Sequence, residues 1–251
     1  AAGRYVMTQT WLIVGATSTI ARAFARQAAT RGESVLLAGR DLEELNHIAA
    51  DCLYRGAPVS ESIAFDARNP DTFPAILEKA EATKGTFSVA VFVGSMPDQA
   101  EIDADPSLVD GTIADNFTGP ARLLTALAPL LEARGDGTVA GVGSVAGDRG
   151  RLGNYVYGAS KAGFHAYLSG LRNRLGRSGV HVATVKPGTV DTAMTWGMEK
   201  LPFVAPPEKI AADILRAADR KKDIIYTPAI WWPIMTIIRA IPERIFKKME
   251  I

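Results

Sequence analysis

The sequence of 251 residues contains little cysteine, little histidine and almost no net charge. The single cysteine, Cys52, excludes an intrachain disulfide and fits a reducing compartment. The three histidines, His47, His165 and His181, lack the spacing of metal ligands, so we expect no metal site and interpret them as structural or surface residues. With Lys+Arg at 28 and Asp+Glu at 27, the net charge of +1 gives no reason to expect nucleic-acid binding.

Long hydrophobic runs and secretion signals are also missing. No stretch of about 18 apolar residues occurs, so we expect no membrane-spanning helix. Residues 1–6 do not resemble the apolar region of a signal peptide, and we interpret them as an expression remnant ahead of a native start at Met7. We expect a cytoplasmic location, and peripheral contact with the inner face of a membrane is the alternative.

The chain does contain an alternation of apolar strands and helical patterns. Apolar runs rich in β-branched residues predict strands at 11–14, 35–38, 59–65, 87–93, 137–142, 180–185 and 224–226. Helical spacing predicts helices over 18–31, 42–54, 108–134, 154–178 and 207–221. This alternation is typical of an α/β fold with a parallel sheet covered on both faces. We expect a single domain over 1–251 that ends in an apolar and basic extension at 228–251.

A tyrosine and a lysine lie four residues apart in the predicted helix 154–178. This spacing puts Tyr157 and Lys161 on one face of the helix. An ammonium beside the phenol would lower the tyrosine pKa towards neutral pH. With Ser144 as a hydrogen-bond donor, these three residues are suited to transferring a proton to or from a substrate oxygen while a hydride is transferred at the adjacent carbon. An ordinary amphipathic helix often carries the same pair, so the spacing alone decides little.

A glycine-bearing turn at 15–21 follows the first predicted strand. In a doubly wound sheet, the pyrophosphate of a dinucleotide lies there against a helix N-terminus. Only Gly15 of the usual three glycines is present, with Thr19 and Ala21 at the other two positions. The hydroxyls at 17–19 can donate hydrogen bonds, although a plain turn with a capping serine would look similar.

The ends of the next two strands bear on the choice of cofactor. Arg40 follows the second strand, where an acidic residue would bind the ribose hydroxyls of NAD. An arginine there can pair with a 2′-phosphate, which favours NADP(H); the alternative is a solvated loop arginine. Asp66, past the third strand, is suited either to accept from the adenine amino group or to cap a helix that begins near Pro70.

Taken together, these residues resemble the short-chain dehydrogenase/reductase family over residues 9–228. The characteristic residues occur along the chain in the order that is typical of the family: Gly15, Arg40, Asp66, Gly94, Asn116, Ser144, Tyr157, Lys161, Pro187, Gly188 and Thr192. The resemblance implies a Rossmann-type doubly wound parallel sheet of about seven strands. It also implies a nicotinamide cofactor and a homodimer or homotetramer.

The resemblance assigns roles to four residues. Tyr157 would be the acid/base, and Ser144 would orient the substrate oxygen. Lys161 would bind the nicotinamide ribose and lower the Tyr157 pKa, while Asn116 would hold a water that links Lys161 to solvent. The family pattern implies cofactor contacts at Gly15, Thr17, Ser18, Thr19, Ile20, Arg40, Asp66, Gly94, Tyr157, Lys161, Pro187, Gly188, Val190 and Thr192. The chain departs from the pattern at the loop glycines and at 91–94, where Val-Phe-Val-Gly replaces Asn-Asn-Ala-Gly.

Two apolar segments bear on the substrate. In this family the residues after Pro187-Gly188 form a lid, and here 194–204 include Met, Trp and Phe. Residues 224–238 contain no charged side chain and include Trp231 and Trp232. The basic residues that follow are Arg239, Arg244, Lys247 and Lys248. One interpretation is membrane contact through 228–248 with tryptophans at headgroup depth; the other is a helix docked on the core or in a subunit interface.

The substrate expectation follows from a narrower resemblance. Gly94 with Asp98-Gln99, and the Trp-rich basic tail, resemble the reductases that act on decaprenylphosphoryl 2-keto-ribose. This implies NADP(H)-dependent reduction of the carbonyl of a lipid-linked keto-sugar. A 3-oxoacyl thioester or small-ketone reductase is the alternative, and a non-catalytic nucleotide-binding regulator is the third hypothesis.

Overall fold

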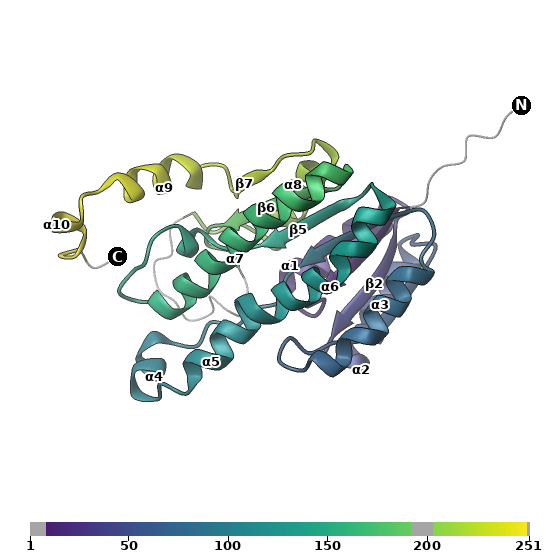
Figure 1. Ribbon diagram of the computed structural model, residues 1–251, viewed down its shortest axis with the longest axis horizontal. Coiled ribbons are helices and arrows are strands. Elements are labelled where there is room, and N and C mark those ends of the chain that lie inside the picture. The colour runs from purple at the N-terminus through teal and green to yellow at the C-terminus, as the bar shows by residue number, and fades with distance from the viewer. Residues whose placement is uncertain (1–8, 192–202, 250–251) are drawn as a thin grey trace, which may run out of the picture.

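Buried apolar segments pair in parallel to form one sheet in the computed structural model, which describes residues 9–191 and 203–249. The strands are β1 (Gln9–Val14), β2 (Ser34–Gly39), β3 (Ser60–Ala64), β4 (Thr86–Val91), β5 (Thr138–Val142), β6 (His181–Pro187) and β7 (Ile224–Thr227). Their order across this seven-stranded sheet is β3-β2-β1-β4-β5-β6-β7 (Figure 1). The order reverses between β1 and β4, where such sheets open a crevice at the carboxyl ends of the strands. The predicted doubly wound parallel sheet is confirmed.

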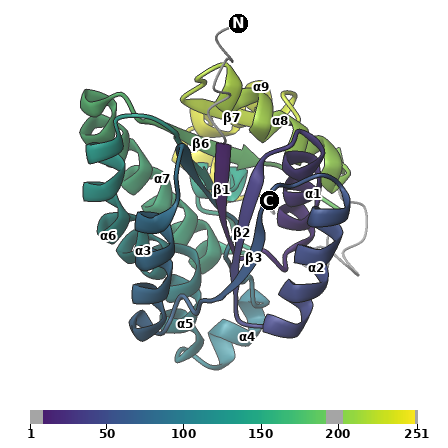
Figure 2. The same cartoon turned by 90° about the vertical axis from the view of Figure 1, so that its right-hand side faces the viewer.

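Helices cover both faces of the sheet (Figure 2). One layer holds α1 (Thr19–Thr30), α2 (Leu42–Tyr54) and α8 (Pro207–Asp219), and the other holds α3 (Phe73–Ala82), α6 (Gly119–Arg134) and α7 (Tyr155–Leu175). The shorter helices are α4 (Gln99–Ala104), α5 (Leu108–Ile113), α9 (Trp231–Ala240) and α10 (Glu243–Phe246). Alternate side chains of the central strands, such as Leu12 and Ile13 of β1, pack into opposite layers, so these strands are mostly apolar, whereas β3 at the sheet edge is largely polar.

The helix predicted over 108–134 is helical throughout but is not a single α-helix. It is interrupted between α5 and α6 by a π-helical turn, Ala114–Thr118, that contains Asn116. Pro120 has no N–H to donate to the carbonyl four residues earlier, which removes one α-helical hydrogen bond at this point. Gly119 packs so closely against Ala67 that a β-carbon would overlap the carbonyl of that residue. The widened turn directs Asn116 into the interior, and π-helical turns often occur at functional sites.

The C-terminal extension is docked on the core through one face of α9. Trp231 and Met235 are buried against the 3₁₀ turn Val145–Asp148. Arg149 donates hydrogen bonds to the carbonyls of Ile238 at 2.7 Å and Ile241 at 2.6 Å, which satisfies the end of α9. The docked-helix interpretation therefore holds for this face of α9.

The opposite face of α9 is open. Trp232 and Ile237 are 61% and 66% exposed, although Trp231 beside them is only 5% exposed. The two tryptophans of the segment thus have different environments. No helix of the described residues is long and apolar enough to cross a membrane. Membrane contact through the open face stays a prediction.

Candidate active site

Most of the predicted site residues line a hollow of about 410 Å³ beside the ends of the central strands. From the predicted set it is lined by Thr17, Ser18, Thr19, Ile20, Gly94, Ser144, Tyr157, Lys161, Pro187, Gly188 and Val190. A smaller hollow of about 180 Å³ is lined by Gly15, Arg40 and Asp66, and the loop residues Thr17 and Ser18 border both. Thr192 and the predicted lid residues 194–202 lie outside the described residues.

Gly15 is required by the backbone of the loop after β1. Its φ is +79°, and a β-carbon would lie 2.7 Å from the backbone nitrogen of Val93. The third glycine of the usual pattern is less necessary, because the Ala21 methyl group is fully buried in the helix layer. Ser18 caps α1 by accepting a hydrogen bond from the Ala21 N–H at 3.2 Å. The interpretation of Ser18 as a capping residue is thus correct. The N-terminus of α1 nevertheless lies at the larger hollow.

The carboxyl end of β2 presents a basic group to the smaller hollow. Arg40 is exposed there, next to the loop that begins at Gly15. Asp41 is engaged as the N-cap of α2, accepting from the Glu44 N–H at 3.0 Å. Asp41, the first carboxylate after β2, is therefore used to cap α2.

Asp66 does not cap the helical turn at Pro70. Asn69 occupies the cap position, and Asp66 instead accepts a hydrogen bond from the Arg68 N–H at 2.9 Å. The capping alternative for Asp66 is therefore wrong. Asp66 lines the smaller hollow, and its contact with adenine stays a prediction.

Asp115 completes the wall of the smaller hollow and was missed by the sequence analysis. Arg68 binds it through two hydrogen bonds of 2.8 and 2.7 Å, and the Ser95 hydroxyl donates to it at 2.7 Å. Burial opposes ionisation, but these hydrogen bonds lower the pKa of Asp115 below its usual value. No sequence motif marks this network, because its members are far apart along the chain.

Lys161 is a buried cation at the floor of the larger hollow. Its side chain points into the interior, and Nζ donates to the carbonyl of Val142 at 3.2 Å. A β-carbon on Gly94 would lie 3.2 Å from Nζ and 2.5 Å from Oδ1 of Asn116, so only glycine leaves both groups room. Burial lowers the pKa of Lys161 from 10.5 to about 8.

Asn116 has one polar atom that no described group satisfies. Its Nδ2 donates to the carbonyls of Ser95 at 2.6 Å and Thr112 at 2.9 Å. Its Oδ1 is buried and has no hydrogen-bond partner among the described residues. An unsatisfied buried acceptor costs about 1–3 kcal/mol, so this atom is suited to receive a donor such as water. The expected water-holding role fits this geometry and stays a prediction.

Tyr157 is the tyrosine that faces the hollow. Tyr155 is exposed and pairs with Asp103, whereas Tyr157 is only 7% exposed. Burial raises the pKa of the Tyr157 hydroxyl, and hydrogen bonding with Ser144 offsets part of that rise. The Lys161 ammonium lies 5.8 Å from the centre of the phenol ring and bonds elsewhere. Burial is the largest influence on the Tyr157 pKa here, and the expectation that Lys161 lowers this pKa stays a prediction.

Ser144 is held at the end of β5 by a buried polar network. Its Oγ accepts from the Ala146 N–H at 3.1 Å, and its own N–H donates to Nε2 of His165 at 3.3 Å. Burial lowers the pKa of His165 to about 3, so this ring stays neutral and can accept that bond. Asp148, at the end of the same turn, accepts from Lys186 at 2.6 Å and from the Tyr226 hydroxyl at 2.6 Å. His165 is thus structural, as expected.

The larger hollow also contains residues that sequence analysis did not assign to it. They are Met96, Arg151, Asn154 and Trp231. The Trp231 indole packs directly on Gly188, where any β-carbon would overlap its Nε1. Tryptophan content marked the tail as unusual, but only the fold shows that α9 returns to this hollow.

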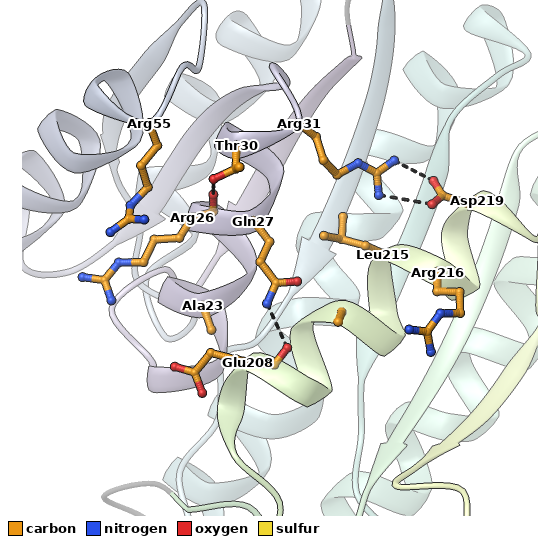
Figure 3. A pocket seen from close by; sticks show the side chains of 11 residues that line it. Ala23, Arg26, Gln27, Thr30, Arg31, Arg55, Glu208, Leu215, Arg216 and Asp219 are labelled. Carbon is orange, nitrogen blue, oxygen red and sulfur yellow. Dashed lines mark hydrogen bonds and ion pairs between the residues drawn. The ribbon is translucent and has the colours of Figure 1, made fainter.

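A further hollow, of about 650 Å³, lies between α1 and α8 and away from these residues (Figure 3). Its arginines are engaged with carboxylates: Arg31 with Asp219 at 2.8 Å, and Arg26 with Asp51 at 2.7 Å. We interpret it as a solvated ion-paired groove. No group of three or more potential metal ligands occurs within 9–191 and 203–249.

The sheet order, the glycine loop and the inward Tyr157 and Lys161 define the class as an α/β protein with a dinucleotide-type crevice. The family model described as short chain dehydrogenase matches residues 9–201. The chain is 31% identical over 239 residues to the uncharacterized oxidoreductase Rv2073c of Mycobacterium tuberculosis, covering 95% of this chain and 96% of that protein. It is 31% identical to an uncharacterized oxidoreductase of Streptomyces coelicolor, covering 96% of this chain and 95% of that one. The chain belongs to the short-chain dehydrogenase family of oxidoreductases.

Solved structures agree with this fold. A short-chain dehydrogenase from Sphingobium yanoikuyae in complex with NADPH superposes with a TM-score of 0.78 at 26% identity, covering 94% of this chain and 97% of that one. The bulky-bulky ketone specific alcohol dehydrogenase from Comamonas testosteroni gives a TM-score of 0.78 at 24% identity, covering 93% and 95%.

Replacing the buried lysine should stabilise the protein near neutral pH. Below pH 8 folding buries the Lys161 ammonium, at a cost on the order of 3 kcal/mol for a pKa lowered from 10.5 to about 8. After subtracting roughly 1 kcal/mol for the lost bond to Val142, Lys161→Met should raise the free energy of unfolding by about 2 kcal/mol at pH 7. Urea unfolding measures this difference.

The difference should shrink at high pH. Between pH 8 and 10.5 the unfolded chain binds more protons at this lysine than the folded chain, so wild-type stability rises with pH over that window. Lys84→Met, at an exposed lysine, is the control and should change stability little at either pH. A Lys161→Met protein no more stable than the control at pH 7 would contradict the assignment.

Proposed function

We propose that this protein is an NADPH-dependent reductase that converts a carbonyl group to an alcohol. The proposal rests on the observation that Ser144, Tyr157 and the buried Lys161 line one hollow beside the glycine-bearing loop. Family membership supports the proposal, as does the Sphingobium yanoikuyae neighbour, whose structure contains NADPH.

The residues present fit a nicotinamide dinucleotide. Gly15 and Gly94 leave space that a β-carbon would fill, and the N-terminus of α1 offers free N–H groups to a pyrophosphate. Arg40 would hold the 2′-phosphate, and Asp66 would accept from adenine. Pro187, Gly188 and Val190 would contact the nicotinamide end.

The protein's own groups then manage the substrate oxygen. When bound, the nicotinamide supplies hydride to the carbonyl carbon. The Ser144 hydroxyl donates a hydrogen bond to the carbonyl oxygen, and Tyr157 transfers its proton to that oxygen as negative charge develops. The raised pKa keeps the phenol protonated at neutral pH, so the tyrosine starts as the acid that reduction needs. The Lys161 ammonium stabilises the tyrosinate left behind, and a water on Asn116 Oδ1 is placed to return the proton.

Removing the tyrosine hydroxyl should abolish turnover and spare cofactor binding. General acid catalysis contributes about 10²–10⁴-fold, so Tyr157→Phe should lower kcat by at least roughly 10²-fold. NADPH binding, followed by nucleotide fluorescence, should change less than about threefold. Tyr155→Phe is the matched control, because that hydroxyl faces Asp103, and it should keep turnover. Retained turnover in Tyr157→Phe would remove the proposed role.

The cofactor preference should depend on Arg40. A charge-assisted pair with the 2′-phosphate is worth about 1.5–3 kcal/mol, so Arg40→Ala should weaken NADPH binding about 10–100-fold. NADH lacks that phosphate, and its affinity should change little. Arg177→Ala, at another exposed arginine, should leave both affinities unchanged. An equal loss for both nucleotides would show that Arg40 does not read the 2′-phosphate.

We propose further that the substrate is a lipid-linked keto-sugar met at an anionic membrane surface. The open face of α9 exposes Trp232 and Ile237, and the exposed cations Arg244, Lys247 and Lys248 follow on the same extension. The carboxylate of Glu243 is engaged by Arg149 at 2.9 Å, so it does not offset these cations. Apolar side chains next to basic ones are the arrangement of an interfacial segment. A homodimer or homotetramer also stays a proposal.

Vesicle binding tests this surface. The protein should sediment with phosphatidylglycerol vesicles more than with phosphatidylcholine vesicles, and salt should weaken the binding. The double variant Trp232→Ser/Ile237→Ser should lower the binding roughly tenfold, because about 1.4 kcal/mol of apolar insertion is lost. Leu53→Ser/Tyr54→Ser removes two exposed apolar side chains on α2 and is the control. Equal binding by both variants, with faster reduction of a 3-oxoacyl thioester than of a polyprenylphosphoryl keto-pentose, would favour the thioester alternative.

A further inference from the structure

Arg151 is a largely buried cation whose donors are mostly unused. It follows the 3₁₀ turn Val145–Asp148 and lines the larger hollow together with Ser144 and Tyr157. Its Nη2 contacts Sδ of Met235 at 3.2 Å, a weak acceptor, and its Nε has no partner among the described residues. No carboxylate of the described chain forms an ion pair with it. Burial lowers the pKa of Arg151, and the charge of Asp148, which bonds to Lys186 and Tyr226, opposes only part of that shift.

Two other partly buried arginines near the sheet have protein partners for their donors. Arg149 donates to the carbonyls at the end of α9 and pairs with Glu243. Arg172 donates to the carbonyl of Val182 at 2.7 Å and to the Thr184 hydroxyl at 2.7 Å. Taking an unpaired guanidinium out of water costs several kcal/mol, so an unsatisfied arginine at a hollow is expected to have a partner that the chain itself does not supply.

Two neutral groups beside Arg151 are also unsatisfied. Nε1 of Trp231 and Oδ1 of Asn154 are buried, line the same hollow and have no hydrogen-bond partner among the described residues. Asn154 comes from the start of α7, whereas α9 delivers Trp231 and also the Met235 that contacts Arg151. The unused polar groups therefore gather in the hollow that contains the proton-transferring tyrosine.

The phosphates of the nucleotide do not account for Arg151. Of the positions suited to them, Gly15 and Arg40 line the smaller hollow, and the loop before α1 borders both hollows. Arg151 lines only the larger of the two hollows, with Ser144 and Tyr157. Its partner is therefore expected from the substrate.

We propose that the larger hollow contains an oxyanion subsite in which Arg151 binds a phosphate or carboxylate group carried by the carbonyl substrate. The planar guanidinium matches both oxyanions through paired hydrogen bonds. Trp231 and Asn154 supply neutral hydrogen-bonding groups to the polar atoms next to the oxyanion. The subsite makes the preferred substrates anionic carbonyl compounds, and this part of the inference rests on the proposed reductase function.

Calorimetry on the NADPH-loaded protein tests the subsite without requiring turnover, and the bound nucleotide occupies the other phosphate sites. The probes are glycerol 3-phosphate, glycerate and neutral glycerol. We expect binding of at least one anion and none of glycerol at up to about 10 mM, and the stronger anion identifies phosphate or carboxylate as the source. Arg151→Met should weaken that binding about 10–100-fold, and Arg151→Lys should recover part of it.

Arg239→Met is the matched control, since it removes an exposed cation of α9 and should leave anion binding unchanged. NADPH titration and thermal melting of Arg151→Met check that the variant is folded. The subsite is overturned when neither anion binds the wild-type holoenzyme, or when folded Arg151→Met binds the anion as the wild type does.

A kinetic comparison separates the two proposals. Wild-type protein should reduce dihydroxyacetone phosphate with a lower KM than dihydroxyacetone if phosphate is the bound anion, and Arg151→Met should raise that KM at least about tenfold. If no carbonyl compound is reduced but anion binding still depends on Arg151, the reductase function fails and the subsite remains.

Discussion

The burial of one ammonium group, that of Lys161, imposes most of the local structure at the crevice. A desolvated lysine needs a fixed acceptor, and the carbonyl of Val142 at the end of β5 provides it at 3.2 Å. Space for the head group requires glycine at position 94, and the same glycine admits the Asn116 amide. The amide reaches that position because the chain leaves α-helical geometry just before Pro120. The strand end, the glycine and the π-helical turn therefore together accommodate one buried charge.

The C-terminal extension contributes to the crevice as well as covering the protein surface. Arg149 satisfies the last carbonyls of α9 and stacks on Phe246 at 3.7 Å, so the extension is fixed at its far end. At its near end Trp231 packs on Gly188, a position that tolerates no side chain. One helix thus carries a wall of the hollow on one face and exposed apolar residues on the other. A lipid-bearing substrate would meet both faces, which is why the two proposals concern the same segment.

Sequence patterns predicted the elements that depend on local chemistry. Apolar runs rich in β-branched residues predicted every strand of the sheet within a few residues. The spacing of Tyr157 and Lys161 predicted which of the two neighbouring tyrosines faces the hollow. Predictions failed where the outcome depends on distant partners. Asp66 was a candidate cap, but Asn69 occupies that position. Arg151 carries no motif at all, because what distinguishes it is a missing partner, and only packing reveals that.

The protonation states of the buried pair bear on the direction of reaction. Burial raises the pKa of Tyr157 and lowers that of Lys161, so it opposes tyrosinate and ammonium separately. At neutral pH the phenol keeps its proton and the lysine, with a pKa of about 8, keeps its charge. The proposed reduction would begin from this state, because it consumes the phenolic proton and leaves a tyrosinate beside the ammonium. Oxidation would have to begin from tyrosinate, which forms only at higher pH, where the lysine that stabilises it loses its charge. Under the proposed function, the same desolvation would therefore favour carbonyl reduction near neutral pH over alcohol oxidation.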